Sequence, residues 1–160
     1  MDYTSIFSMH QELSLIAVFL LTFVMDLFLP EEHRYLARRG ACIALSLHLV
    51  LNVVPDEVVL FGGMYHSTPM ASVMKSILTL GTILVFLQSS DWLKRQDVKH
   101  KNGEFYILTL STLIGMYFMV SAGHFLLFFL GLELATVPMA CLIAFDKYKG
   151  NRAEAGAKFI

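Results

Sequence analysis

The stretch from Ser121 to Phe145, SAGHFLLFFLGLELATVPMACLIAF, constrains the fold of this chain more than any other segment. It is long enough to cross a bilayer, because a membrane-spanning helix needs about 20 predominantly apolar residues. A single carboxylate, Glu133, lies near its middle. A charge at that depth costs at least about 2.5–3.5 kcal/mol, and intramembrane acids are commonly functional for that reason. We therefore expect a membrane-spanning helix in which Glu133 is a functional residue.

Two neighbours of the acid indicate how this helix is packed. Gly131 precedes Glu133 by two positions and Pro138 follows it by five. A glycine lets another helix approach closely, and a proline frees a backbone carbonyl that must find a partner inside the protein. We expect the helix to be buried against other helices, with Glu133 facing inward.

The composition indicates an integral membrane protein. Of the 160 residues, 56% are hydrophobic and 16% are charged, whereas about 25% of the residues in a soluble domain are charged. A net charge of −1 without a basic stripe argues against a nucleic-acid partner. Cys42 and Cys141 lie inside apolar runs and the six histidines lack metal-ligand spacing, so neither a disulfide framework nor a metal site is predicted.

The order of apolar runs predicts an all-α integral membrane fold, with residues 1–160 forming a single transmembrane domain. The expected spans cover residues about 13–29, 41–60, 70–87, 104–120 and 123–145, and a sixth helix begins at about residue 153. Pro55 and Asp56 interrupt the second run, which is expected to restart as VVLFGG. A loop is expected from Gly62 to Pro69.

Lysine and arginine residues alternate between the two sides of these spans. The loop after the first span contains three, the loop after the third contains four and the segment after the fifth contains four, so eleven of the twelve lie on one side. The remaining one, Lys75, lies within the third span. Positively charged loops remain in the cytoplasm. The predicted N-terminus is therefore outside.

The sequence stops at Ile160, a few residues into the expected sixth helix. The segment from Ala153 to Ile160 contains good helix formers and no helix-terminating signal. We therefore expect a fragment of a longer protein.

Three ionisable residues are candidates for proton transfer: Glu133 at mid-span, Glu104 at the cytoplasmic entry of the fourth span and Lys158 at the start of the sixth helix. A buried acid beside a base can take up and release protons, because burial and the neighbouring charge act in opposite directions on its proton affinity. Each residue also has a structural interpretation. Glu133 could be satisfied by a neighbouring hydroxyl or amide, Glu104 could stabilise its first helical turn, and Lys158 could be an interface lysine.

Further polar residues within the expected spans include Asp26, Lys75, His48 and Asn52. Asp26 is interpreted as an acid that reaches the headgroups or caps a neighbouring helix. Lys75 either extends its ammonium group to the outer interface or forms a buried ion pair. His48 and Asn52 are four residues apart and share a helix face, which we expect to meet another helix. No nucleophile–base pair, phosphate-binding loop or metal constellation is visible, so no catalytic or cofactor site is predicted.

The segment from Gly103 to Ile160 contains three motifs in a fixed order. GEFY opens the fourth span, FLGLEL forms the core of the fifth, and EAGAKF opens the next helix. With this combination the sequence resembles subunit N of bacterial NADH–quinone oxidoreductase, respiratory complex I. DLFLP, from Asp26 to Pro30, is similar to the end of the first helix in that family. The resemblance covers the whole chain, weakly before Gly103 and strongly after it.

The resemblance implies the N-terminal part of the antiporter-like fold, in which complete members have about fourteen helices in inverted repeats. By the family pattern, Glu133 would be the fifth-helix glutamate that pairs with a lysine two helices on. Lys158 would be the lysine at the entrance of the sixth helix, and Glu104 the acid of the fourth. His124 and Phe159 depart from the commoner residues of the family, and neither change affects Glu133.

The function implied by the resemblance is proton translocation coupled to quinone reduction elsewhere in the complex. The chain would be a multi-pass subunit of the bacterial inner membrane, with other membrane-arm subunits and the lipid bilayer as partners. No autonomous catalysis is expected, and the FMN and iron–sulfur clusters of the complex would belong to other subunits. One alternative is a subunit of a multi-subunit cation/proton antiporter or membrane-bound hydrogenase. Another is a structural membrane assembly subunit without a transport role.

Overall fold

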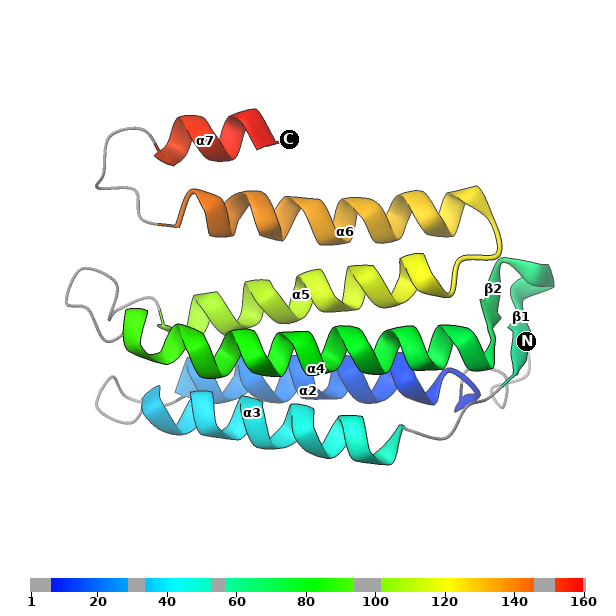
Figure 1. Cartoon of the computed structure of the whole chain (residues 1–160), viewed down its shortest axis with the longest axis horizontal. Helices are drawn as coiled ribbons and strands as arrows, with labels where there is room; N and C mark the ends of the chain where they lie inside the picture. Colours follow the sequence, from blue (N-terminus) through cyan, green and yellow to red (C-terminus); the bar gives the residue numbers. More distant parts are fainter. Residues whose placement is uncertain (1–6, 29–33, 53–56, 94–101, 146–151, 160) are drawn as a thin grey trace.

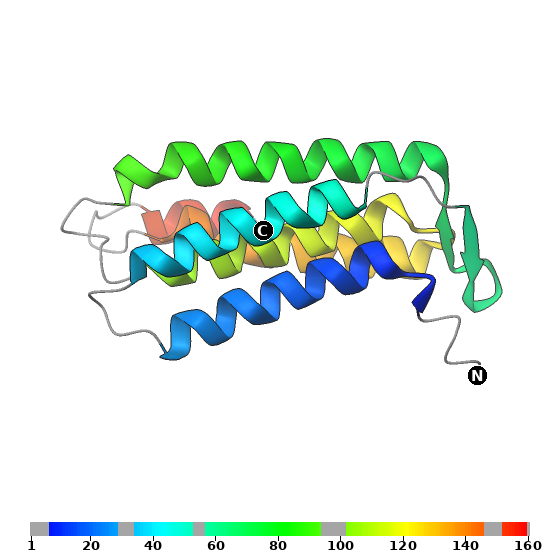
Figure 2. The same ribbon diagram turned by 90° about the horizontal axis from the view of Figure 1, so that it is seen from below.

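The computed structural model describes residues 7–28, 34–52, 57–93, 102–145 and 152–159, and Figure 1 shows their arrangement. In chain order the elements are α2 (His10–Phe28), α3 (Arg34–Leu51), β1 (Val58–Leu60), the 3-10 turn η2 (Phe61–Gly63), β2 (Tyr65–Ser67), α4 (Pro69–Trp92), α5 (Asn102–Val120), α6 (Phe125–Ile143) and α7 (Arg152–Phe159). The helices lie side by side with their axes nearly parallel, and the hairpin lies at one end of the bundle (Figures 1 and 2).

The predicted all-α membrane class is confirmed. Among the described residues, α2, α4, α5 and α6 are long and apolar enough to cross a membrane, and α3 contains a shorter apolar segment, Arg39–Leu51. The 19 residues of α6 give a length of about 28 Å, which matches a hydrocarbon core of about 30 Å. Four of the five expected spans therefore have full spanning length within the described chain.

The predicted second span is wrong at its end. Its helix, α3, ends at Leu51, and Val58–Leu60 forms a strand rather than a continuing helix; residues 53–56 of that predicted span lie outside the described residues. Strand β1 pairs antiparallel with β2, which occupies the expected loop from Gly62 to Pro69. The β-branched pair at 58 and 59 suits a strand. Gly62 and Gly63 have φ angles of 65° and 91° in the turn, which glycine adopts without steric cost.

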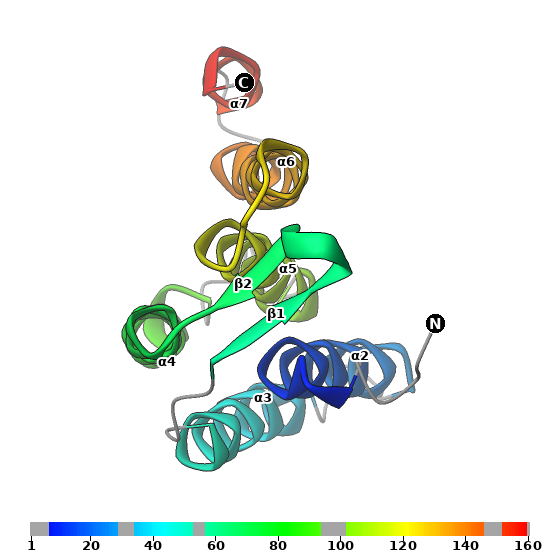
Figure 3. The ribbon, with the colours of Figure 1, turned by 90° about the vertical axis from the view of Figure 1, so that its right-hand side faces the viewer.

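Helix α5 lies at the centre of the bundle, with α2, α3 and α4 on one side and α6 on the other (Figure 3). It supplies five of the twelve residues of the buried hydrophobic core in the described chain, and its rings make edge contacts with other elements. The Phe86 ring of α4, for example, lies 4.8 Å from the Tyr106 ring at 87°. The core residues are Leu15, Val18, Ala41, Leu45, Phe86, Leu93, Tyr106, Leu110, Leu113, Ile114, Tyr117 and Phe145.

Helices α5 and α6 approach each other most closely where both have a glycine. A Cβ atom added at Gly115 would lie 2.5 Å from the Ala135 backbone nitrogen and 2.7 Å from the Gly131 carbonyl oxygen. The expected close approach of a helix at Gly131 is therefore confirmed. Pro138 lies inside α6 and is buried, and the Thr112 hydroxyl of α5 donates to the nearby Ala135 carbonyl at 3.4 Å. The two helices consequently pack backbone to backbone.

The starts of α4 and α6 have side-chain caps. The Thr68 hydroxyl accepts a hydrogen bond from the Ala71 amide at 3.1 Å, and Pro69 occupies the first turn of α4, a combination typical of helix N-termini. His124 caps α6 by accepting from the Leu126 amide at 3.2 Å. These caps set the residues at which α4 begins after the hairpin and α6 begins after the α5–α6 connection.

Candidate functional site

The three predicted proton-transfer residues lie on three helices that form a row, α5, α6 and α7 (Figure 3). Glu104 is in the first turn of α5 and is exposed. Glu133 is at the middle of α6 and is also exposed. Lys158 is in α7, where its side chain is 75% exposed and pairs with Glu154 at 2.6 Å. In the described part of the chain, no recorded ion pair or hydrogen bond joins the three side chains.

Glu133 does not face inward among the described helices, in contrast to the expectation from the sequence. The buried positions of α6 include Gly131, Ala135 and Pro138, and the first two contact α5. Two residues along a helix correspond to a rotation of about 200°. Because Gly131 faces α5, Glu133 lies on the opposite side of the same helix.

The structure instead places an ion pair in the interior at the hairpin end of the bundle. Lys75, in the second turn of α4, has its Nζ 2.6 Å from Glu12 Oε1 in the first turn of α2. Both side chains are at most 2% exposed. Of the two interpretations of Lys75, the structure supports the buried ion pair rather than a side chain that extends to the interface.

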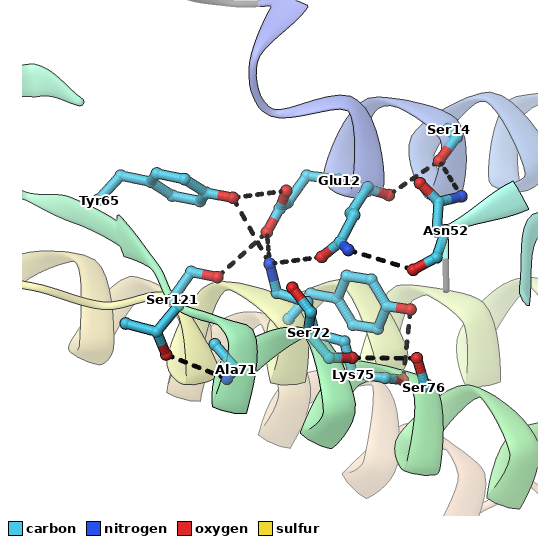
Figure 4. A network of polar contacts seen from close by, with 12 residues as sticks. Glu12, Ser14, Asn52, Tyr65, Ala71, Ser72, Lys75, Ser76 and Ser121 are labelled. Atoms are coloured by element: carbon cyan, nitrogen blue, oxygen red, sulfur yellow. Dashed lines mark hydrogen bonds and ion pairs between the residues drawn. The ribbon is translucent and has the colours of Figure 1, made fainter. Parts of the chain in front are cut away.

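Three elements besides α4 direct donors or acceptors at this pair (Figure 4). Glu12 accepts hydrogen bonds from the Tyr65 hydroxyl of β2 at 2.8 Å and from the Ser121 hydroxyl at the end of α5 at 3.2 Å. The Lys75 ammonium also donates to Gln11 Oε1 at 3.2 Å. Buried charges are tolerated when every polar atom has a partner. The carboxylate therefore joins α2, α4, the hairpin and the α5–α6 connection.

A second set of polar side chains adjoins the pair on the α3 side. The His48 ring lies between the Ser14 hydroxyl at 2.9 Å from Nδ1 and the Tyr117 hydroxyl at 3.0 Å from Nε2. The Tyr117 hydroxyl also contacts Thr79 of α4 at 2.5 Å, and the Asn52 amide donates to Ser14 at 3.1 Å. The expectation that His48 and Asn52 face another helix is confirmed, since both are buried against α2 or α5.

The surroundings of Tyr65 favour its neutral form. Burial, together with the adjacent Glu12 carboxylate, raises the pKa of the Tyr65 hydroxyl above its usual value. A neutral hydroxyl remains a donor to the carboxylate. Tyr65 thus stays in the state that the ion pair requires over the physiological pH range.

Sequence reasoning missed Glu12 as a partner of Lys75. Glu12 lies one position before the expected first span, so it is not among the polar residues expected within the spans. A signal was nevertheless available: the predicted topology places the start of the first span and the start of the third at the same end. Opposite charges at similar depth on the same side are candidates for pairing.

Asp26 lies at the opposite end of the bundle, against the first turn of α5. A Cβ atom at Gly103 would overlap the Asp26 carboxylate, and Asp26 Oδ1 is buried without a hydrogen-bond partner among the described residues. An acid beside a helix N-terminus is favoured by the helix dipole. Asp26 thus lies beside the end of a neighbouring helix, where the capping interpretation places it, but its Oδ1 makes no capping hydrogen bond among the described residues.

The described residues do not include a cluster of three His, Cys, Asp or Glu side chains suited to a metal ion. The arrangement that they do contain is a satisfied buried ion pair. Removing one member of such a pair leaves a buried charge and typically costs about 3–5 kcal/mol. Removal of either partner is therefore expected to disturb how the hairpin ends of these helices are held.

Comparisons with known proteins give one consistent result. The chain is 74% identical over all of its 160 residues to NADH-quinone oxidoreductase subunit N of Phocaeicola vulgatus. It is 38% identical over its full length to the subunit of the same name from Azobacteroides pseudotrichonymphae, and 34% identical over 93% of its length to that from Desulforamulus reducens. No protein-family model matches the chain.

The alignments cover 34%, 34% and 31% of these three relatives, so the chain spans about a third of the length of the curated relatives that it matches. Its membrane helices agree with a membrane subunit. The alignments and the helices together confirm the resemblance noted in the motifs between Gly103 and Ile160. Over its full length the chain therefore matches a segment of NADH-quinone oxidoreductase subunit N.

Proposed function

We propose that this chain is part of an antiporter-like membrane subunit that contributes to proton translocation, coupled to quinone reduction elsewhere in NADH–quinone oxidoreductase. In this proposal Glu133 is the central proton-transfer group, with Lys158 and Glu104 assisting on the neighbouring helices. The chain performs no catalysis alone. Its partners are the other membrane-arm subunits, and its location is the inner membrane of a bacterium.

The single observation on which the proposal depends is the position of Glu133. It lies at the centre of a helix of spanning length, and its exposed neighbours include Phe129, Leu130 and Val137. Leaving a carboxylate on such a face in contact with lipid is costly, so a protein partner or an aqueous cavity is needed there. The relatives are about three times as long as this chain, and their additional length is sufficient to cover that face.

The placement of Lys158 is compatible with a role beside Glu133. Glu133 lies ten residues from the end of α6 at Ile143, or about 15 Å along the helix. Lys158 lies six residues from the start of α7 at Arg152, or about 9 Å. Because α7 runs back alongside α6 from its C-terminal end (Figure 1), Lys158 lies beside the C-terminal half of α6, toward the depth of Glu133.

The test is to replace Glu133 by Gln in the complete subunit within its assembled complex. We expect electron transfer from NADH to quinone to persist while proton pumping per NADH falls by at least half. The measurement is the proton gradient formed by membrane vesicles at a matched NADH oxidation rate. Glu133→Asp, which keeps the charge, should retain most of the pumping.

Glu57→Gln is the matched control, because Glu57 is an exposed acid outside the membrane helices. It should leave pumping unchanged. Wild-type pumping in the Glu133→Gln complex would contradict the proposed function and favour a structural assembly role. Co-purification of the chain with transporter subunits that lack NADH oxidation would favour the antiporter alternative.

A further inference from the structure

The Glu12 carboxylate joins elements from four parts of the chain. It binds Lys75 of α4 at 2.6 Å, Tyr65 of β2 at 2.8 Å and Ser121 of the α5–α6 connection at 3.2 Å. The four side chains are each at most 2% exposed. These contacts connect residues up to 109 positions apart. A change at this one group therefore affects the outer ends of several helices together.

The hairpin and the α5–α6 connection are also joined through their backbones. The His66 amide donates to the Ser121 carbonyl at 2.9 Å, and the Gly123 amide donates to the Met64 carbonyl at 2.9 Å. Tyr65 and Ala122 form an antiparallel bridge between these hydrogen bonds. Since α6 begins at Phe125, the first turn of that helix follows directly from the segment that the hairpin holds.

The position of α6 is further tied to that of α5. Their backbones touch at Gly115 and Gly131, so the two helices are expected to move as one body. Contacts that hold the end of α5 and the α5–α6 connection in place therefore also hold α6 in place. Glu133 is in the third turn of α6.

We propose that Glu12 and Lys75 are positioning residues that lock the hairpin onto the α5–α6 connection and thereby hold the helix that contains Glu133. This inference rests on the proposed function, because it assigns the pair a part in proton transfer through Glu133. Glu12 and Lys75 do not themselves transfer protons in this scheme. The hydrogen-bond partners of the pair donate to the ionised Glu12 carboxylate or accept from the charged Lys75 ammonium. This is expected of a structural ion pair rather than of a relay group.

The experiment compares Glu12→Gln, Lys75→Met and the combination of the two in the complete subunit within its complex. Each single variant leaves one buried charge without its partner, whereas the double variant leaves neither. Two quantities are measured: hydrogen exchange of the backbone amides of residues 57–68 and 121–124, and proton pumping per NADH oxidised at matched amounts of assembled complex.

We expect each single variant to raise amide exchange in both segments at least tenfold and to lower pumping per NADH at least threefold. The double variant should recover part of both losses, because the amide oxygen introduced by Glu12→Gln still accepts hydrogen bonds from Tyr65 and Ser121. Ser72→Ala is the matched control, since Ser72 is 2% exposed on the same face of α4 and its Oγ has no hydrogen-bond partner among the described residues. It should change neither quantity.

Three results would overturn the inference. Unchanged exchange in both single variants would mean that the pair does not hold the hairpin. Raised exchange with normal pumping per NADH would mean that the pair is structural without positioning α6. Normal exchange with abolished pumping in the double variant would mean that the pair transfers protons itself.

Two milder variants keep the test decisive if the single variants do not assemble. Tyr65→Phe and Ser121→Ala each remove one hydrogen bond to Glu12 without leaving a buried charge, and they should raise exchange and lower pumping in the same direction. The exchange measurement does not depend on the role of Glu133. A failure of the proposed function, seen as normal pumping in Glu133→Gln, is therefore distinguishable from a failure of this inference.

Discussion

The pKa of the Tyr65 hydroxyl is set by the groups that surround it. The Tyr65 hydroxyl donates to the Glu12 carboxylate at 2.8 Å, and its oxygen accepts from the Lys75 ammonium at 3.5 Å. A hydrogen bond to a charged group is worth about 1.5–3 kcal/mol. Burial and the Glu12 carboxylate raise the pKa of this hydroxyl from an ordinary value of 10.0, so the native state holds the proton more tightly than the unfolded chain does.

The raised pKa of Tyr65 predicts a pH-dependent stability. A group with a higher pKa in the folded state contributes stability that is complete below its unfolded pKa and is lost as the pH rises above it. Tyr65→Phe should therefore lower the stability of the subunit by about 1.5–3 kcal/mol at pH 7 to 9, and the difference from wild type should shrink above about pH 10. The measurement is thermal unfolding of both proteins across this pH range. A difference that stayed constant up to pH 11 would contradict the prediction.

At the scale of elements, the contact between α5 and α6 depends on the absence of side chains. Both Gly115 and Gly131 face backbone atoms of the other helix, and a Cβ at Gly131 would lie 2.8 Å from the Gly115 carbonyl oxygen. Backbone atoms cannot move aside as a flexible side chain can. A methyl group at either position must therefore separate the helices.

Gly115→Ala should destabilise the α5–α6 pair by about 1–3 kcal/mol, the usual cost of overpacking. Gly81→Ala is the matched control, because a Cβ at Gly81 meets nothing within 4 Å in the described chain. That change should be neutral or stabilise α4 by roughly 0.5–1 kcal/mol, since alanine favours a helix more than glycine does. The measurement is the thermal stability of the complete subunit. Equal effects of the two substitutions would show that the contact is not tight.

At the scale of the whole molecule, the two ends of the bundle differ in structure. One end has the hairpin and the buried Glu12–Lys75 pair, and the other contains the starts of α3, α5 and α7 (Figure 1). The basic residues of the connections at residues 94–101 and 146–151 lie outside the described residues. Their distribution in the sequence nonetheless predicts that the hairpin end faces outward.

The predicted topology can be tested by labelling single cysteines. In a protein whose Cys42 and Cys141 are replaced, His66→Cys should react with a membrane-impermeant thiol reagent in spheroplasts, because His66 is exposed in β2. Ala155→Cys, at an exposed position of α7, should react only in inverted vesicles. Labelling of both cysteines from the same side would contradict the five-span topology, and the reverse pattern would contradict its orientation.

Sequence and tertiary structure determined different features of this protein. The sequence alone indicated the membrane class, most of the spans and the family, because the length of an apolar run, the position of Lys and Arg, and the GEFY and FLGLEL motifs are local properties. It also offered the buried ion pair of Lys75 as one of two possibilities. These features require no knowledge of which helices are neighbours.

Tertiary structure decided the partners and the directions of the polar side chains. Lys75 meets a residue 63 positions away, and Ser121 meets the same carboxylate from 109 positions away. No periodicity along the chain specifies such a pairing. Glu133 faces away from α5 because Gly131 takes the close contact, and the segment after Pro55 forms β1 because it pairs with β2. Each outcome depends on which segments pack together in space, and a local sequence pattern fixes only the faces that are available for that packing.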